Sequence, residues 1–183
     1  DAEESASAFE KAPIVRGVKI MKFNAAILMA GALLSNAALA ADCADDSGPR
    51  KALESYITAM QAHKFNDAYN FVTANMTDGK SREDWAAQQK LFYEGGEVNI
   101  LSMDIRKAQA SDDDAQCAAK ANVPNILKSR DKFNNQGTTE FEVYVTVKDG
   151  DSWKVDSQET LFDAAGVQKW FPGEKVPDFK DQY

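Results

Sequence analysis

The spacing of apolar residues changes at Val98, and this change limits the chain to a small set of folds. Before Val98, apolar residues recur at intervals of three and four, which is typical of helices. After Val98 they alternate with polar residues, which is typical of antiparallel strands with one covered face. The alternating segments are 99–107, 117–123, 141–148 and 153–156, and the sequence KDGD at 148–151 indicates a hairpin turn. Helices followed by strands predict an α+β domain with a mainly antiparallel sheet of four strands or more.

Three helices are expected before the sheet. The first begins at Ser47 as its N-cap, and its apolar residues at helical spacing are Leu53, Tyr56, Ile57 and Met60. The second is short and covers 65–72. The third begins with the capping-box-like sequence SRED at 81–84 and ends at Gly95.

Residues 1–40 are excluded from the fold. Residues 21–40 have a short basic start, an apolar run from Ala25 to Leu34 and the small residues Ala38 to Ala40, which together predict a secretory signal peptide. The apolar run is too short to cross a hydrocarbon core of about 30 Å. Residues 1–20 are interpreted as an upstream extension. We therefore expect a mature chain that begins at Ala41 and works in the periplasm or outside the cell.

The charge of the mature chain disfavours two classes of partner. Residues 1–40 hold four acids and four bases, so residues 41–183 keep the full net charge of −8. An acidic domain gains little from binding nucleic acid or an anionic membrane surface. Neither partner is expected, and no membrane insertion is expected after cleavage.

Cys43 and Cys117 are the two cysteines of the chain, and an even count in an oxidising compartment favours one disulfide between them. The alternative is two free thiols, with Cys117 buried. The one histidine, His63, is far from both cysteines in the sequence, so no metal site is expected. No motif indicates a cofactor.

The order of elements resembles the nuclear transport factor 2-like superfamily, which includes cystatin-like α+β cones. The matching segments are ALESYITAMQAHKFNDAYNFV at 52–72 and the hairpin VYVTVKDGDSWKVDS at 143–157. The resemblance covers about residues 49–161, and it implies that the sheet is curved into a cone around the helices. It also implies a choice of functions, because this superfamily contains isomerase-like and hydrolase-like enzymes, ligand binders and assembly modules.

The enzymes of the superfamily hold carboxylates inside the cone, sometimes with Tyr or Arg. The alternation predicts that Asp104, Arg106 and Glu142 lie on the solvated face, because each is out of step with its apolar neighbours. Glu159 is in step with Trp153 and is the one carboxylate expected to point inward. Tyr56 matches the general location of the isomerases' oxyanion-binding tyrosine, and its alternative role is in the core.

The leading hypothesis is an exported, non-catalytic domain, 41–161, that binds a small apolar ligand or a protein partner. The expected pocket residues are Tyr56, Met60, Trp85, Phe92, Phe141, Val143, Trp153 and Glu159. The same residues could instead form a closed core. The alternatives in function are an isomerase- or hydrolase-type enzyme that uses Tyr56 and Glu159, and a homodimeric interaction or inhibitor module. The aromatic tail, 162–183, is expected to pack on the domain.

Overall fold

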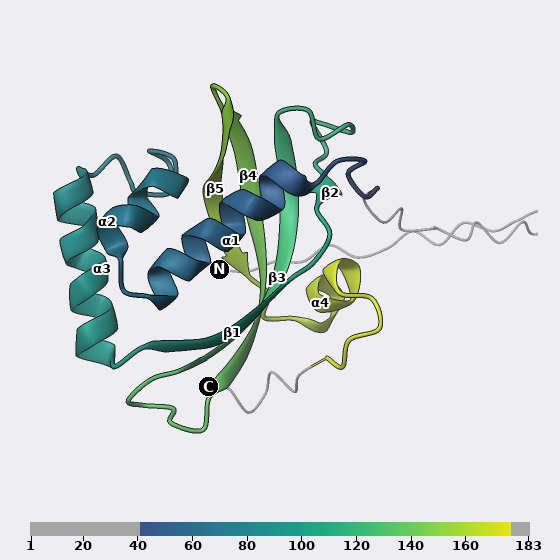
Figure 1. Cartoon of the computed structure of the whole chain (residues 1–183). Helices are drawn as coiled ribbons and strands as arrows, with labels where there is room; N and C mark the ends of the chain where they lie inside the picture. Colours follow the sequence, from purple (N-terminus) through teal and green to yellow (C-terminus); the bar gives the residue numbers. More distant parts are fainter. Residues whose placement is uncertain (1–40, 177–183) are drawn as a thin grey trace, which may run out of the picture. The chain divides into compact units, whose positions relative to one another are not determined.

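The computed structural model describes residues 41–176, and these form one α+β unit (Figure 1). The bounds of the helices are α1 (Ser47–Gln61), α2 (Phe65–Ala68), the 3-10 helix η1 (Tyr69–Phe71), α3 (Arg82–Gly96) and α4 (Ala164–Trp170). The bounds of the strands are β1 (Asn99–Ile105), β2 (Gln109–Ala110), β3 (Lys120–Arg130), β4 (Thr138–Asp149) and β5 (Ser152–Thr160). The predicted fold class is confirmed.

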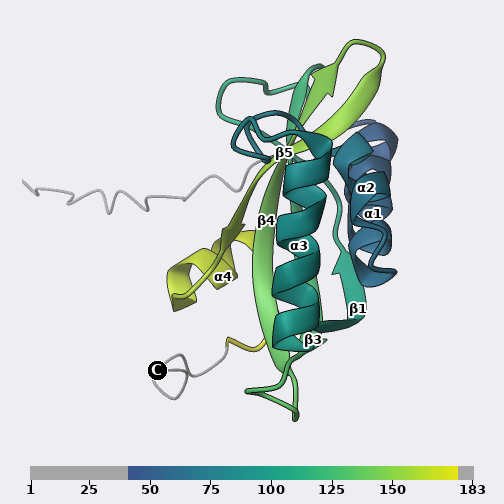
Figure 2. The same cartoon turned by 90° about the vertical axis from the view of Figure 1, so that its left-hand side faces the viewer.

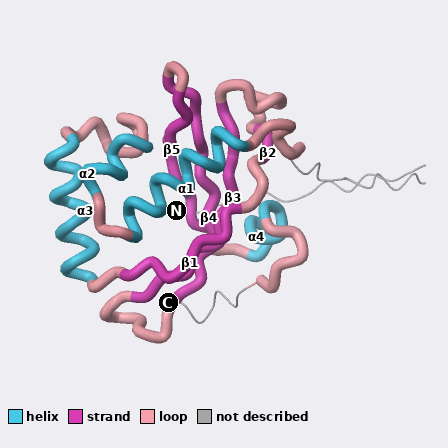
Figure 3. The backbone as a smooth tube through the Cα atoms, in the orientation of Figure 1, coloured by secondary structure: helices cyan, strands magenta, loops and turns pink. Residues whose placement is uncertain are grey.

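The strands form an antiparallel sheet in the order β1-β3-β4-β5. The short β2 pairs with Ala121 and Asn122 near the start of β3, on the same side of β3 as β1. Helix α1 crosses one face of this sheet, whereas α4 lies on the opposite face (Figures 1 and 2). The face under α1 is called the inner face here, and the face under α4 the outer face. Figure 3 shows that the β2–β3 and β3–β4 loops lie at opposite ends of the sheet.

Two apolar clusters hold the helices to the two faces. The larger cluster joins α1, α2 and α3 to the inner face, and it includes the fully buried Leu53, Ile57, Val123 and Val155. The smaller cluster joins α4 to the outer face, and its buried members are Ile126, Phe141, Val143, Leu161, Val167 and Phe171. The central strands are therefore covered on both sides.

This double covering reverses the predicted direction of side chains on β4. Phe141 and Val143, expected to point inward, pack against α4 on the outer face. Tyr144 belongs to the inner cluster, and the even-numbered Glu142 and Thr146 share its face. The expectation that Glu142 is solvated is wrong, because its side chain is 1% exposed. Alternation marks two faces of a strand but does not say which one meets the helices.

Three local predictions also need correction. On β1, the pairing register shifts between Ile100 and Ser102, so Ile100 is buried and Leu101 is 51% exposed. Cys117 does not begin a strand; it lies in the turn before β3 with a positive φ of 55°. Ser47 is the first residue of α1 rather than its N-cap. In contrast, the Ser81 hydroxyl does cap α3, because it accepts a hydrogen bond from the Asp84 amide at 3.1 Å.

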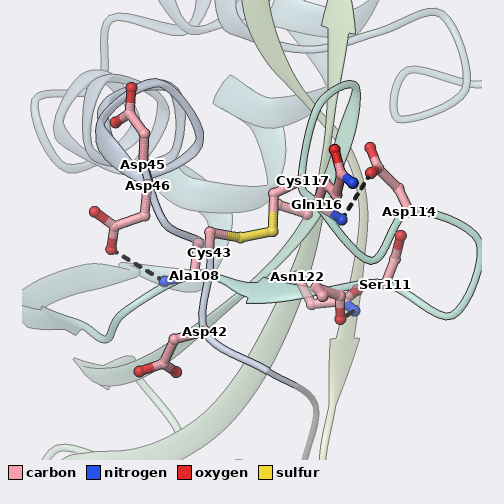
Figure 4. The surroundings of a disulfide bond; sticks show 12 residues. Asp42, Cys43, Asp45, Asp46, Ala108, Ser111, Asp114, Gln116, Cys117 and Asn122 are labelled. Carbon is pink, nitrogen blue, oxygen red and sulfur yellow. Dashed lines mark hydrogen bonds between the residues drawn. A yellow bond between two sulfur atoms is a disulfide. The ribbon is translucent and has the colours of Figure 1, made fainter.

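The predicted disulfide between Cys43 and Cys117 is confirmed, with the two Cα atoms 5.7 Å apart (Figure 4). It joins the segment before α1 to the turn before β3. Close to it, a carboxylate oxygen of Asp46 accepts a hydrogen bond from the Ala108 amide at 3.2 Å (Figure 4). A disulfide in place indicates an oxidising compartment. The predicted signal peptide and the upstream extension lie outside the described residues.

Candidate functional site

A cavity of about 290 Å³ lies between α1, α3 and the inner face of β1, β3, β4 and β5. Its volume is near the lower end of the range for sites that hold small molecules. The helices contribute an apolar side with Ile57, Met60 and Phe92, and the sheet contributes a polar side with Glu140, Glu142, Tyr144 and Gln158. The remaining lining residues are Tyr56, Gln89, Tyr93, Val98, Ile100, Leu127, Ser129 and Asp131. One side of a bound molecule would thus meet carbon and the other side would meet hydrogen-bonding groups.

Glu142 is held in the polar side by three neutral donors. Its Oε2 accepts hydrogen bonds from Asn125 Nδ2 at 3.0 Å and from the Tyr144 hydroxyl at 3.1 Å. Its Oε1 accepts one from Gln158 Nε2 at 2.5 Å. The donors come from β3, β4 and β5, so the carboxyl group is positioned by the centre of the sheet rather than by a loop.

The environment of Glu142 raises the pKa of its carboxyl group from 4.5 to about 7. Burial is the main cause, since a charge loses its hydration there. The hydrogen bonds from Asn125 and Tyr144 lower the pKa, and the nearby Glu140 raises it. The burial outweighs the hydrogen bonds, so near pH 7 this carboxyl group exists in both its neutral and its charged form.

Two more carboxylates line the same cavity. Glu140 shares a face of β4 with Glu142, and Asp131 begins the loop after β3. Burial, followed by the charge of Asp131, raises the pKa of Glu140. Within residues 41–176, neither Asp131, Glu140 nor Glu142 forms an ion pair with Lys, Arg or His.

Three tyrosines complete the site. Burial raises the pKa of Tyr93 to about 12, and it also raises the pKa of Tyr56 and of Tyr144. All three hydroxyls therefore stay neutral at physiological pH. The rings of Tyr56 and Tyr144 meet edge to face with centroids 6.4 Å apart. Tyr56 is 7% exposed, and in the described part of the chain its hydroxyl has no hydrogen-bond partner, unlike that of Tyr144.

The structure brings three of the eight expected pocket residues to the cavity: Tyr56, Met60 and Phe92. Trp85 is buried against Tyr69, with ring centroids 5.8 Å apart, and does not line the cavity. Trp153 packs over Gly48 at the start of α1, where a Cβ atom would overlap the indole ring.

The other three expected residues lie on the outer face. Phe141 and Val143 pack against α4, as described above. Glu159 is exposed and pairs with Val143 across β4 and β5, which puts it on the same outer face. The expectation that Glu159 points inward is therefore wrong, and Glu142 is the carboxylate that reaches the cavity. One signal was present in the sequence: Glu142 lies within an otherwise apolar and aromatic run, FEVYV at 141–145.

The part of the chain that the structure describes shows neither a candidate metal site nor a helix that could span a membrane. Residues 41–176 contain no group of three or more His, Cys, Asp and Glu side chains that could hold a metal ion. Over the same residues, none of the helices has the length and apolar character needed to cross a membrane.

Comparison with solved structures finds similar arrangements in proteins of low sequence identity. A domain of unknown function with a cystatin-like fold from Nostoc punctiforme is 14% identical, with a TM-score of 0.48 over 64% of this chain and 76% of that one. A ketosteroid isomerase-like protein from Erwinia carotovora atroseptica is 18% identical, with a TM-score of 0.44 over 60% of this chain and 89% of that one. Bd1075 of Bdellovibrio bacteriovorus is 12% identical, with a TM-score of 0.44 over 61% of this chain.

The similar structures thus include one described as cystatin-like and one described as ketosteroid isomerase-like. The chain spans 39% of the length of the Bdellovibrio protein. No protein-family model matches the sequence, and no curated protein matches it either.

Proposed function

We propose that this domain binds a small molecule with a largely apolar body in the cavity between α1, α3 and the sheet. The observation that carries the proposal is the buried Glu142, whose carboxyl group is fixed by three donors beside an apolar side formed by Ile57, Met60 and Phe92. Pockets that combine an apolar lining with a few positioned polar groups are typical of small-molecule sites. The Tyr56 hydroxyl supports the proposal, because Tyr56 lines the cavity and its hydroxyl makes no hydrogen bond within residues 41–176, so it can bond to a ligand.

We further propose that binding takes place in the periplasm or outside the cell. The disulfide between Cys43 and Cys117 supports an oxidising compartment. The predicted signal peptide at 21–40 agrees with export. N-terminal sequencing of the protein from an exported fraction should begin at Ala41, and uncleaved protein in the cytoplasm would contradict this proposal.

A matched pair of variants on α3 tests the proposed binding site. Gln89 lines the cavity and makes no side-chain hydrogen bond within residues 41–176, so Q89W should fill the cavity without breaking a hydrogen bond. Gln88 is exposed on the same helix and does not line the cavity, so Q88W adds the same bulk elsewhere. Saturation-transfer NMR with small aromatic molecules should detect binding to the wild type and to Q88W, and none to Q89W. Equal binding to both variants would mean that the molecules bind outside this cavity.

Acid–base catalysis is the second candidate function, and the pKa of about 7 at Glu142 is the observation that favours it. An ionised Glu142 could take a proton from the carbon beside a ligand carbonyl, and its acid form could return that proton to another carbon. The carbonyl oxygen would accept a hydrogen bond from Tyr56. This assigns to Glu142 the role that the sequence analysis considered for Glu159.

Exchange of carbon-bound hydrogen for deuterium in small ketones tests this second candidate. The wild type should catalyse exchange with a rate that rises through pH 7 as Glu142 ionises. E142Q should abolish exchange, while E159Q should leave it unchanged because Glu159 is exposed on the outer face. An exchange rate that is equal in E142Q and in the wild type would rule Glu142 out as the base.

A further inference from the structure

We propose that the ligand of the cavity is a small organic cation, with a protonated amine joined to an apolar body. This inference rests on the proposed binding function and names the chemical class of its ligand. It follows from the charges, the aromatic rings and the unpaired hydroxyl that surround the same space.

The charge of the lining is entirely negative. Asp131, Glu140 and Glu142 line the cavity, and its lining contains no Lys, Arg or His. The bonds that these acids do make are to neutral groups: Glu142 accepts from Asn125, Tyr144 and Gln158. Asp131 Oδ1 accepts from the amides of Phe133 at 2.7 Å and Asn134 at 2.8 Å. Within residues 41–176 no basic side chain pairs with these acids, so a cationic ligand would be attracted and an anionic one repelled.

The basic side chains that neighbour lining residues in the sequence are directed elsewhere. Lys128 and Arg130 alternate with the lining residues Leu127 and Ser129 on β3, so they belong to the opposite face. The ammonium group of Lys132 donates to the Gly95 carbonyl at the end of α3. Lys90 on α3 lies 3.8 Å from Glu94, on the outside of the helix.

Aromatic rings form much of the remaining lining, from Tyr56, Phe92, Tyr93 and Tyr144. A cation near the face of such rings is attracted by their electron density, and the attraction is larger where water is excluded. Carboxylates and rings around one space therefore suit a charged nitrogen better than a neutral polar group.

The hydroxyl of Tyr56 is an independent observation that points to a ligand. The residue is 7% exposed and lines the cavity, yet its hydroxyl has no partner within the described range. Its pKa is raised by burial and, to a smaller extent, by the nearby Tyr93 and Glu142, so the hydroxyl stays neutral and its oxygen can accept a hydrogen bond. An ammonium group offers three donors, which Tyr56, Glu140 and Glu142 could share.

Three probes with the same phenyl body and different charges test the inference: phenethylamine, 2-phenylethanol and 3-phenylpropanoate. Isothermal titration at pH 8 should show that the amine binds at least about tenfold more tightly than the alcohol. The carboxylate should bind most weakly. If the alcohol binds as tightly as the amine, the cation inference is wrong and the proposed binding function stands. If none of the three binds, both are wrong.

The pH dependence and two substitutions strengthen the test. The affinity for the amine should rise by at least about tenfold from pH 5 to pH 8, because Glu142 becomes charged while the amine stays protonated. The affinity for the alcohol should not rise.

E142Q should remove the pH dependence, and E140Q should weaken amine binding even if E142Q folds poorly. E94Q, an exposed acid on α3 outside the cavity, controls for net charge and should bind like the wild type. An E140Q variant that binds the amine as tightly as E94Q would overturn the inference.

Discussion

Glu142 is a residue whose burial has a cost that depends on pH. Its side chain is 1% exposed, and the carboxyl group has only neutral hydrogen-bond partners in the described part of the chain. Asn125, one of these partners, is fully buried and leaves its own Oδ1 without a partner. If the side-chain amide of Asn125 rotated by about 180°, its Oδ1 would face Glu142 and could accept a hydrogen bond from the protonated carboxyl group. The site can therefore serve both protonation states.

The first prediction is that stability falls as pH rises from about 4.5 to about 7. In this range the folded protein holds the Glu142 proton while the unfolded chain has released it, because the folded pKa is raised to about 7. The contribution is fully present below 4.5 and is lost as pH passes 7. At about 1.4 kcal/mol for each pH unit between the two pKa values, it amounts to about 3 kcal/mol.

Urea unfolding of the wild type and E142Q across this pH range measures the effect. E142Q keeps a neutral group of similar shape, so the part of the pH slope that comes from residue 142 should disappear. E159Q is the control, because Glu159 is exposed. If E142Q and the wild type kept the same slope between pH 5 and pH 8, the assignment of the pKa to Glu142 would fail.

The second prediction concerns how much the free energy of unfolding changes when the hydroxyl of Tyr56 or of Tyr144 is removed. Y56F should change the free energy of unfolding by less than about 0.5 kcal/mol, because the Tyr56 hydroxyl has no partner to lose within residues 41–176. Y144F should cost about 1–2 kcal/mol, because the Tyr144 hydroxyl donates to Glu142. Thermal and urea unfolding at pH 8 check both values. A cost for Y56F as large as that for Y144F would mean that Tyr56 has a partner in the folded protein.

At the scale of elements, strand β4 explains both what the sequence predicts well and what it predicts badly. The period of two correctly identifies β4 and β5 and the turn between them. It does not identify the inner face, because Phe141 and Val143 are buried under α4 just as Tyr144 is buried under α1. The inward-facing Glu142 was missed for this reason. The sequence of β4 alone does not indicate that α4 packs on Phe141 and buries the outer face.

The third prediction concerns how much the packing of α4 on the outer face contributes to the free energy of unfolding. Phe171, the residue after α4, is 2% exposed and meets the Phe141 ring with centroids 5.1 Å apart. F171A should lower the free energy of unfolding by about 3–5 kcal/mol. Phe162 lies before α4 and is 56% exposed, so F162A is a matched control with an expected change within about 0.5 kcal/mol. Equal effects of the two substitutions in urea unfolding would contradict the packing of α4 on the sheet.

At the scale of the whole described unit, the sequence is sufficient for the fold class and insufficient for the site. Helices α1 to α3, strands β1, β3, β4 and β5, and the disulfide follow from local patterns of apolar residues, turns and cysteine parity, whereas β2 and α4 were not predicted. The cavity depends on contacts between α1, α3 and four strands that are distant in the sequence. Tyr56 and Met60 were identified because they share a helix face, whereas Glu142 and Glu140 required knowledge of how β4 is covered.

The last prediction concerns the disulfide, which links residues 74 positions apart. Closing a loop of this length restricts the unfolded chain, and on the chain-entropy model this stabilises the folded state by roughly 4 kcal/mol. Replacing both cysteines, C43S together with C117S, should therefore lower the free energy of unfolding by about this amount. Both cysteines are buried in the inner cluster, so the two hydroxyls that replace them add a smaller cost.

A reducing agent separates these two costs. The wild type in reductant should approach the stability of the double variant, because the bridge is lost in both, whereas the double variant should not respond to reductant. Urea unfolding with and without reductant, on protein whose mass confirms the oxidised state, measures each difference. A wild type that is equally stable in both conditions, with its thiols shown to be reduced, would mean that the link from Cys43 to Cys117 does not stabilise the fold.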